Sequence, residues 1–219
     1  MNFITGYKTL GLFQSDEEAA NWMTTQFDRV PKAGDIKYVD TSGDGKVDID
    51  DEVVISKLNY MPEIVYGLNV SGEWKTFDFM ANFQGAANRT LMYYSAARTM
   101  FVGGGTNNTF SYMKDYWSVD NTDAKYPRAW LDSQPNNQYD SEFWLRDGSY
   151  VKLKNIELGY SPGARALKKV GFDKIRIFVS ATNLLTISKL KDFDPEISDG
   201  AGAYYPQQRT FNAGINLTF

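Results

Sequence analysis

The chain has 219 residues, with 15% aromatic residues, a formal net charge of −4, and neither cysteine nor histidine. This composition excludes disulfide scaffolds, thiol nucleophiles, zinc sites built from Cys and His, and His-dependent catalytic triads. The slightly acidic balance, without a cluster of basic residues, also argues against nucleic acid as a partner.

Residues 15–27 carry the signals of a helix. Ser15 is a favourable N-cap, and Glu18 stands where a capping box bonds back to the Ser15 amide. The apolar stripe of this helix would consist of Trp22, Met23 and Phe27. We expect the helix to pack on a neighbouring loop.

The segment DTSGDGKVDIDD, residues 40–51, has the spacing of an oxygen-rich calcium loop. Ca²⁺ prefers oxygen ligands around a tight turn, and Gly45 supplies the glycine that such a turn needs at its sixth position. The predicted calcium ligands are Asp40, Ser42, Asp44, Lys46 (through its carbonyl), Asp48 and Asp51.

Two features set this loop apart from an EF-hand. Asp51 stands where that pattern has Glu, and a shorter carboxylate reaches the ion less easily, so we expect modest affinity. The preceding residues 34–39 are predicted to form a strand and not a helix. The alternative is an Asp/Gly-rich turn whose carboxylates bond to its own backbone, and the sequence leaves both interpretations open.

Several segments alternate apolar and polar residues with the period of two that predicts a two-faced β-strand. They are residues 61–74, 75–85, 149–160, 173–184 and 211–219. The alternation in the third slips by one residue at Lys154–Asn155, which predicts a β-bulge. Each is about the 9–11 residues that a tilted strand needs to cross a bilayer.

The last segment, FNAGINLTF, has the strictest alternation. Its apolar face carries Phe211, Ala213, Ile215, Leu217 and Phe219. A strand that ends on an aromatic residue is typical of outer-membrane β-barrels, which present apolar side chains to lipid up to an aromatic girdle. An edge strand of a soluble sheet is the alternative for this segment.

The connections between these segments alternate between short and long. A tight hairpin at 73–75 and a short stretch with a small helix, 162–171, are the short ones; 88–147 and 184–207 are long. Barrels sort their connections in this way, with long loops outside and short turns in the periplasm. The expected fold class is therefore all-β, namely antiparallel strands of a transmembrane β-barrel with long extracellular loops and short periplasmic turns.

The N-terminal stretch MNFITGYKTLGLFQ lacks the basic region and apolar run of an export signal. Because an outer-membrane protein needs such a signal, we expect the chain to be the C-terminal part of a longer protein. Residues 1–60 would form an outer-loop region with the short helix and the calcium-like loop, and 61–219 the barrel strands and their loops.

Loop 88–147 is rich in aromatic residues, which could capture sugar rings or peptide side chains. We expect them chiefly to pack the loops against each other and to supply the interface girdle. They are Tyr93, Tyr94, Phe101, Phe110, Tyr112, Tyr116, Trp117, Tyr126, Trp130, Tyr139, Phe143 and Trp144.

In order and spacing, these stretches resemble the C-terminal part of the SusC/RagA-like family of TonB-dependent outer-membrane transporters. The resemblance rests on LGLFQSDEEA, GDIKYVDTSGDGKVDIDDEVVI, MPEIVYGLNVSGEWKTFDFMANFQG, DYWSVDNTDAKYPR, FWLRDGSYVKLKNIELGYSP, IRIFVSATNLLTISKLKDFDPE and PQQRTFNAGINLTF. The family implies a signal peptide, a TonB-interacting segment, a plug domain and earlier strands of a barrel of about 22 strands, none of which is present here.

The resemblance also implies a function. A full-length transporter would import oligosaccharides, or peptides in some members, with energy delivered through TonB, and would sit in outer-membrane lipid. A SusD-like surface lipoprotein would cover its outer loops, and assembly machinery would recognise the aromatic Phe219. No catalytic residue is implied, so the chain is not expected to be an enzyme.

Two other classes of protein are the alternatives. One is a soluble calcium-dependent glycan-binding β-domain, which would fold alone in buffer. The other is a glycosidase, whose paired carboxylates no motif in this sequence supports.

Overall fold

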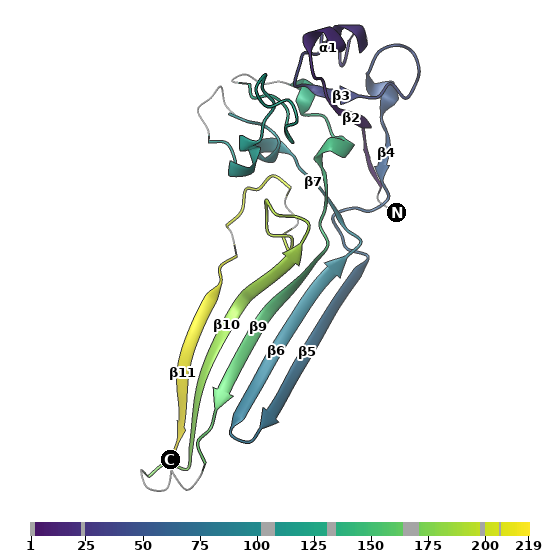
Figure 1. Ribbon diagram of the computed structural model, residues 1–219. Coiled ribbons are helices and arrows are strands. Elements are labelled where there is room, and N and C mark those ends of the chain that lie inside the picture. Colours follow the sequence, from purple (N-terminus) through teal and green to yellow (C-terminus); the bar gives the residue numbers. More distant parts are fainter. Residues whose placement is uncertain are drawn as a thin grey trace. The chain divides into compact units, whose positions relative to one another are not determined.

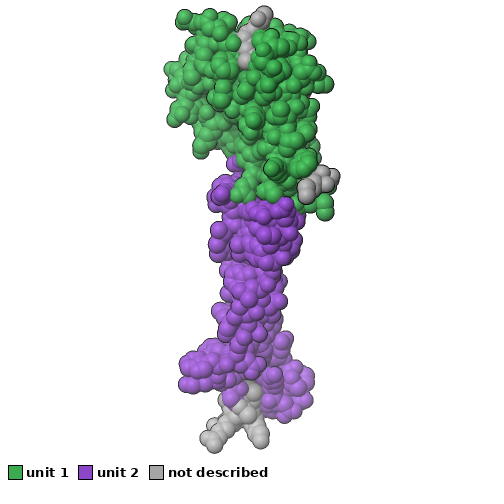
Figure 2. All heavy atoms as spheres, turned by 90° about the vertical axis from the view of Figure 1, so that its right-hand side faces the viewer, with its two compact units in different colours: residues 1–61, 89–147, 197–204 green, residues 62–88, 148–196, 205–219 purple. Residues whose placement is uncertain are grey.

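The computed structural model of the protein describes residues 3–22, 25–101, 108–130, 135–163, 171–197, 200–205 and 207–219. The chain divides into two compact units, shown in Figure 2. Unit 1 comprises residues 1–61, 89–147 and 197–204, and unit 2 comprises residues 62–88, 148–196 and 205–219.

Unit 2 is built on a five-stranded antiparallel sheet (Figure 1). Its strands, in sheet order, are β11 (Thr210–Thr218), β10 (Lys174–Ser188), β9 (Tyr150–Tyr160), β6 (Phe77–Ala87) and β5 (Ile64–Trp74). Each corresponds to a segment whose alternation predicted a strand.

The cross-strand register places the apolar residues of these strands on one face of the sheet. Leu68 lies opposite Phe83 on β6, and Val179 lies opposite Leu158 on β9. Leu68, Leu158 and Val179 are 58%, 54% and 52% exposed. Side chains this apolar and this exposed indicate a surface that another apolar phase covers.

The predicted irregularity in β9 is present. The register against β6 shifts between Asn155 and Leu153, so that Lys154 has no partner across the ladder and forms a bulge. The register of β10 against β9 shifts at the same level, where Asn183 has a φ of 52°. Strand β10 continues beyond this point to Ser188, so the sequence prediction ended it four residues too early.

Long and short connections leave opposite ends of the sheet. Ser188 of β10 lies opposite Tyr150 of β9, so the connections that follow β10 and precede β9 share one end. At the other end Lys75 and Thr76 form the turn between β5 and β6, and Lys75 has a φ of 58°. Of the small helix predicted at 162–171, residues 164–170 lie outside the described residues.

The described residues of unit 1 form three two-stranded sheets. They pair β1 (Ile4–Gly6) with β4 (Val53–Ser56), β2 (Thr9–Leu12) with β3 (Ile36–Tyr38), and β7 (Thr90–Met92) with β8 (Leu145–Asp147). Short 3-10 helices span Ile49–Asp51, Ser95–Ala97, Ser111–Lys114, Pro135–Asn137 and Glu142–Trp144. The strand predicted at 34–39 is β3. The other strands of unit 1 have only three or four residues, too few to show a period of two in the sequence.

Helix α1 spans Asp16–Trp22 and has ended by residue 25, so it is shorter than predicted; Met23, part of its predicted stripe, lies outside the described residues. Ser15 caps it as expected, because Ser15 Oγ accepts a hydrogen bond from the Glu18 amide at 3.0 Å. The Glu18 carboxylate bonds back to the amide of Gln14 and not to that of Ser15. Phe27 has a φ of 53° and lies outside the helix, so it is not part of an apolar stripe on α1. Among the residues described, no helix has the length and apolar character that crossing a membrane requires.

The core of unit 1 is aromatic and polar at the same time. Tyr38 is fully buried, and its hydroxyl donates to the carbonyl of Asn136 at 2.7 Å. The buried Gln26 side chain acts as a strand partner for β3, since it donates to the Ile36 carbonyl and accepts from the Tyr38 amide. These bonds satisfy backbone groups that burial would otherwise leave unpaired.

Candidate functional site

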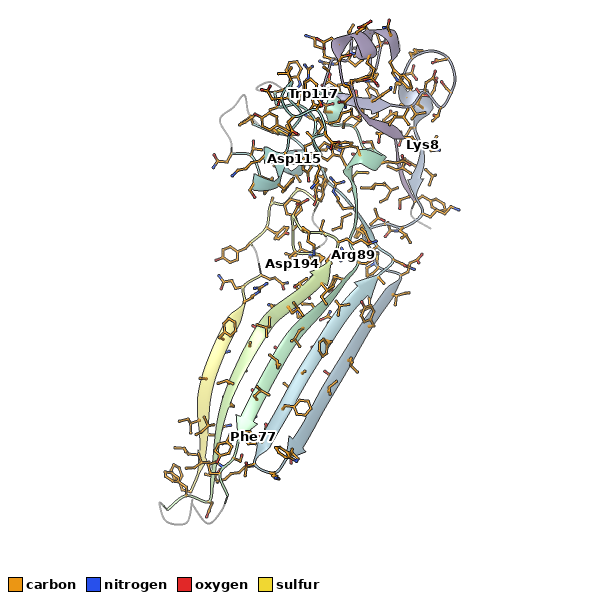
Figure 3. The ribbon with its side chains drawn as sticks, in the orientation of Figure 1. Lys8, Phe77, Arg89, Asp115, Trp117 and Asp194 are labelled. Carbon is orange, nitrogen blue, oxygen red and sulfur yellow. The ribbon has the colours of Figure 1, made fainter. Side chains whose placement is uncertain are left out.

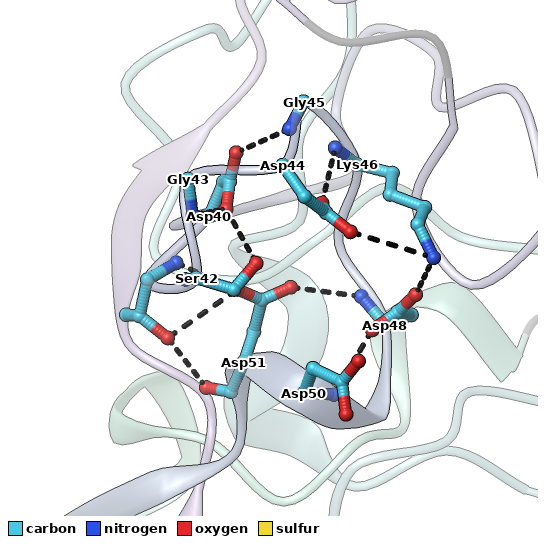
Figure 4. A network of polar contacts seen from close by, with 10 residues as sticks. Asp40, Ser42, Gly43, Asp44, Gly45, Lys46, Asp48, Asp50 and Asp51 are labelled. Carbon is cyan, nitrogen blue, oxygen red and sulfur yellow. Dashed lines mark hydrogen bonds and ion pairs between the residues drawn. The ribbon is translucent and has the colours of Figure 1, made fainter.

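The Asp-rich loop, residues 40–51, lies in unit 1 between β3 and β4 (Figure 4). Asp40 accepts hydrogen bonds from Ser42 Oγ at 3.1 Å, from the Gly43 amide at 2.5 Å and from the Gly45 amide at 2.8 Å. Gly43 and Gly45 have φ values of 80° and 90°, a conformation that favours glycine. The bond from Gly45 contributes most to holding the pKa of Asp40 below its ordinary value.

Asp51, at the last position of the loop, is fully buried. Its Oδ1 accepts from the amides of Thr41 at 2.7 Å and Ser42 at 2.8 Å, and its Oδ2 accepts from the Asp48 amide at 2.9 Å. Asp48 in turn caps the 3-10 helix Ile49–Asp51 by accepting from the Asp50 amide. The Asp51 carboxylate therefore ties the two ends of the loop together.

Lys46 places a positive charge among these carboxylates. Its ammonium contacts Asp48 and lies 3.5 Å from Asp44 Oδ2. The hydrogen bond from Lys46 is the main cause that lowers the pKa of Asp48, and the same contact raises the pKa of Lys46. Because these side chains are solvent-exposed, their attraction adds little to stability.

The predicted calcium ligands lie in one loop, and its four ligand carboxylates, those of Asp40, Asp44, Asp48 and Asp51, accept hydrogen bonds from protein donors. Among the described residues, no group of three or more Asp, Glu, His or Cys side chains could hold a metal ion as arranged. The carboxylates bond to the backbone of their own loop, as they do in an Asx turn. Calcium would require the Lys46 ammonium to leave Asp44 and Asp48, and calcium binding stays a prediction.

The polar face of the unit 2 sheet is a second candidate site. Asn69, Asn82, Asn155 and Thr182 are cross-strand neighbours and form a row of amide and hydroxyl groups across β5, β6, β9 and β10. Asn82 donates a hydrogen bond to Asn69. Such groups both donate and accept, so the row can bind hydroxyl or peptide groups without a charge preference.

A cluster of ion pairs lies on the same face towards the β5–β6 turn. Arg176 Nη2 lies 2.7 Å from Glu157 Oε1, and Arg176 Nε lies 3.1 Å from Asp78 Oδ2. Gly159 makes room for this contact, since a Cβ there would come within 2.3 Å of Asp78 Oδ2. Sequence reasoning missed the cluster because alternation assigns a face to each residue but does not identify a diagonal partner two strands away in the sheet.

The aromatic residues of loop 88–147 pack mainly within unit 1, as predicted. Tyr93 and Trp144 are fully buried, and Tyr126 stacks on Trp144 with ring centroids 6.3 Å apart. Tyr94 and Tyr116 remain 45% and 42% exposed, so a ligand could reach these two rings.

Comparison with known proteins finds similarity to TonB-dependent receptors. The chain is 31% identical to TonB-dependent receptor P26 of Formosa agariphila over 235 residues, which cover 98% of this chain and 22% of that protein. It is 29% identical to TonB-dependent receptor SusC of Bacteroides thetaiotaomicron over 190 residues, covering 83% of this chain and 17% of that protein. The chain thus spans about a fifth of the length of these curated relatives. No protein-family model matches it.

The fold is shared with a solved structure, that of the RagAB peptide transporter. The TM-score is 0.71 at 22% sequence identity, and the match covers 100% of this chain and 23% of the other. Both the resemblance to SusC/RagA-like TonB-dependent transporters and the fold class, antiparallel strands from the C-terminal part of a β-barrel, are confirmed.

Proposed function

We propose that this chain, similar in sequence and fold to SusC/RagA-like TonB-dependent receptors, is the C-terminal part of an outer-membrane transporter of a Gram-negative bacterium. The full-length protein would import oligosaccharides or peptides with energy delivered through TonB, which would engage the N-terminal part. A SusD-like surface lipoprotein would cover its outer loops. The relatives are named as receptors, and we assign no catalytic residue.

The two-faced sheet of unit 2 is the observation that carries this proposal. On one face Phe211 and Ile215 are 69% and 62% exposed, and on the other lie the amide row and the Arg176 cluster. Exposing apolar surface to water costs about 25 cal/mol per Å², so this face is unfavourable in water and favourable in lipid. A membrane barrel needs this arrangement, apolar outside and polar inside.

The topology supports an orientation in the membrane. The long connections leave one end of the sheet, and in barrels of this type the long loops face outward. Unit 1 would then be an outer-loop region, and the Lys75–Thr76 turn would face the periplasm. Trp74 and Phe77, which close this hairpin, would belong to the periplasmic aromatic girdle.

The substrate class rests on weaker support. The solved relative is described as a peptide transporter. The uncharged amide row and the exposed Tyr94 and Tyr116 suit the hydroxyl groups and ring faces of sugars as well as the amides of peptides. We therefore propose an uncharged or weakly charged oligomer of either kind.

Expression of the full-length protein tests the proposal. We expect the protein in the outer-membrane fraction. On a denaturing gel an unboiled sample should migrate faster than a boiled one, because a closed barrel resists detergent. Uptake of the substrate should stop when the energy supply through TonB is removed. Full-length protein that is recovered from the periplasm in water, without detergent, would contradict the proposal and favour a soluble β-domain.

A further inference from the structure

Among the described residues of unit 2, Lys152 of β9 is the most deeply buried charged side chain, with 1% exposure. Its ammonium lies 2.9 Å from both carboxylate oxygens of Asp194, 2.9 Å from Glu196 Oε2 and 3.1 Å from Gln207 Oε1. A buried ammonium is stable only when its N–H groups have acceptors, and here each of them does.

The β9 bulge brings a second lysine to the same acceptor. Lys154 is the bulged residue, and its ammonium lies 2.9 Å from both oxygens of Glu196. Burial would raise the pKa of Glu196, but the hydrogen bonds from Lys154 and Lys152 outweigh burial and hold that pKa below its ordinary value. The carboxylate is therefore ionised and shared between two cations.

The acceptors all come from the connection between β10 and β11. Figure 3 shows Asp194 just beyond the end of β10. Asp194 and Glu196 follow β10 and Gln207 precedes β11, and we call residues 192–196, which belong to unit 2, the strap. Lys152 lies opposite Gln84 and Thr186, so it belongs to the polar face of the sheet, and its acceptors lie on that face.

We propose that Lys152 and Lys154 form an ionic clamp that holds the strap against the polar face and so limits access to that face at its outer end. The inference rests on the proposed function, in which the polar face lines the interior of the barrel. Lys152 is a positioning residue in this proposal, because it acts through the strap and needs no contact with a substrate.

The absence of cysteine from this chain makes a direct test practical, in the full-length protein with any cysteines outside this chain replaced. Thr186→Cys places a single thiol opposite Lys152, on the face that the strap would shield. Asn212→Cys places one further along the same face, opposite Ser180. The readout is the rate at which a water-soluble maleimide labels each thiol.

Lys152→Met should raise the labelling rate at position 186 about tenfold or more, because it leaves two carboxylates without their buried partner. The rate at position 212 should not change. Lys152→Arg, which retains the charge and the donors, should restore most of the protection. The matched control is Lys191→Met, which removes an exposed lysine near the strap and should leave both rates unchanged.

An unchanged rate at position 186 in a folded Lys152→Met barrel would overturn the clamp, as would an equal rise in Lys191→Met. If Lys152→Met does not assemble, Glu196→Gln weakens the acceptor that both lysines share and gives the same comparison. The shift between boiled and unboiled gels reports the barrel separately. Its loss in the parent protein would refute the proposed function, whereas its presence without a rate change would refute the clamp alone.

Discussion

The two units of this chain distribute similar residues in opposite ways. In unit 1 the large rings of Tyr38, Tyr93 and Trp144 are fully buried. In unit 2 Trp74 and Phe211 are 68% and 69% exposed, while the charged Lys152 is 1% exposed. Unit 1 is thus stabilised by a core of its own, whereas the sheet of unit 2 has an apolar face that only a surrounding apolar phase can bury.

This difference predicts which changes each unit tolerates. A substitution in unit 1 should act through cavity formation and lost hydrogen bonds, whatever the solvent outside. A charged residue introduced on the apolar face of unit 2 should change the stability little if that face meets water, and should destabilise the protein if the face meets lipid. The following experiments test these expectations, beginning with the largest effect.

Trp144→Ala should be the most damaging single change in unit 1. It removes a fully buried ring and the hydrogen bond from Trp144 Nε1 to the Asn137 carbonyl at 2.9 Å, at a cost of about 3–5 kcal/mol. The full-length variant should still show a gel-shifted barrel, while protease added to intact cells should cleave its outer loops faster. Val119→Ala, at a residue that is 81% exposed, is the control and should behave as the parent. Equal protease resistance in all three proteins would mean that unit 1 has no core of its own.

Leu68→Lys tests the apolar face of unit 2. Leu68 is 58% exposed, so lysine there would cost little if the face met water. In lipid the charge should cost about 2–4 kcal/mol near the bilayer midplane and reduce the amount of folded barrel. Ser71→Lys puts the same charge on the opposite face of the same strand and should assemble normally. Equal amounts of folded barrel in both variants would contradict the assignment of the lipid-facing side.

The sheet of unit 2 was predicted well because alternate side chains of a strand point to opposite faces, so that a two-faced strand shows a period of two in its sequence. That alternation alone predicts the long strands and the bulge at Lys154. It also predicts that Leu68 and Val179 lie on the apolar face of the sheet. The predicted end of β10 was wrong. The bulge at Asn183 interrupts the alternation, although the pairing with β9 continues to Ser188.

Unit 1 was much harder to predict from sequence, because its order depends on contacts between residues far apart in the chain. Its strands have three or four residues, and Gln26 completes β3 with a side chain, which no local pattern indicates. The contacts of Lys152 were not predicted for the same reason, since Asp194 and Glu196 are more than 40 residues away from it in the sequence. The Asp-rich loop was found because the spacing of its residues is local. The ion pairs of the Lys46 ammonium with Asp44 and Asp48 were not predicted.

Calcium binding by the Asp-rich loop sharpens the comparison, since it would stabilise unit 1 alone. Asp44→Ala should abolish the heat of calcium binding in calorimetry of the full-length protein without unfolding the loop, because the Asp44 side chain is 40% exposed and Asp51 holds the loop ends together. At a hundredfold excess of Ca²⁺ over its Kd, the stabilisation lost is about 2.7 kcal/mol. Asp50→Ala, outside the predicted ligand set, should retain binding. Absence of heat from the parent protein at millimolar Ca²⁺ would favour the self-satisfied Asx turn.

The smallest expected effect on stability is that of Phe219, which follows the last residue of β11 and is 84% exposed. Its ring lies 5.5 Å from that of Phe172, a pair worth about 0.5–1.5 kcal/mol. Phe172→Ala removes the same ring contact and leaves the terminal aromatic in place. If Phe219 acts as a recognition signal for assembly, Phe219→Asp should sharply reduce the amount of protein in the outer membrane. Phe172→Ala should then reach normal amounts, and uptake per assembled molecule should be unchanged in both. Normal surface levels of Phe219→Asp would contradict the assembly role, and equal losses in the two variants would assign the effect to the ring pair.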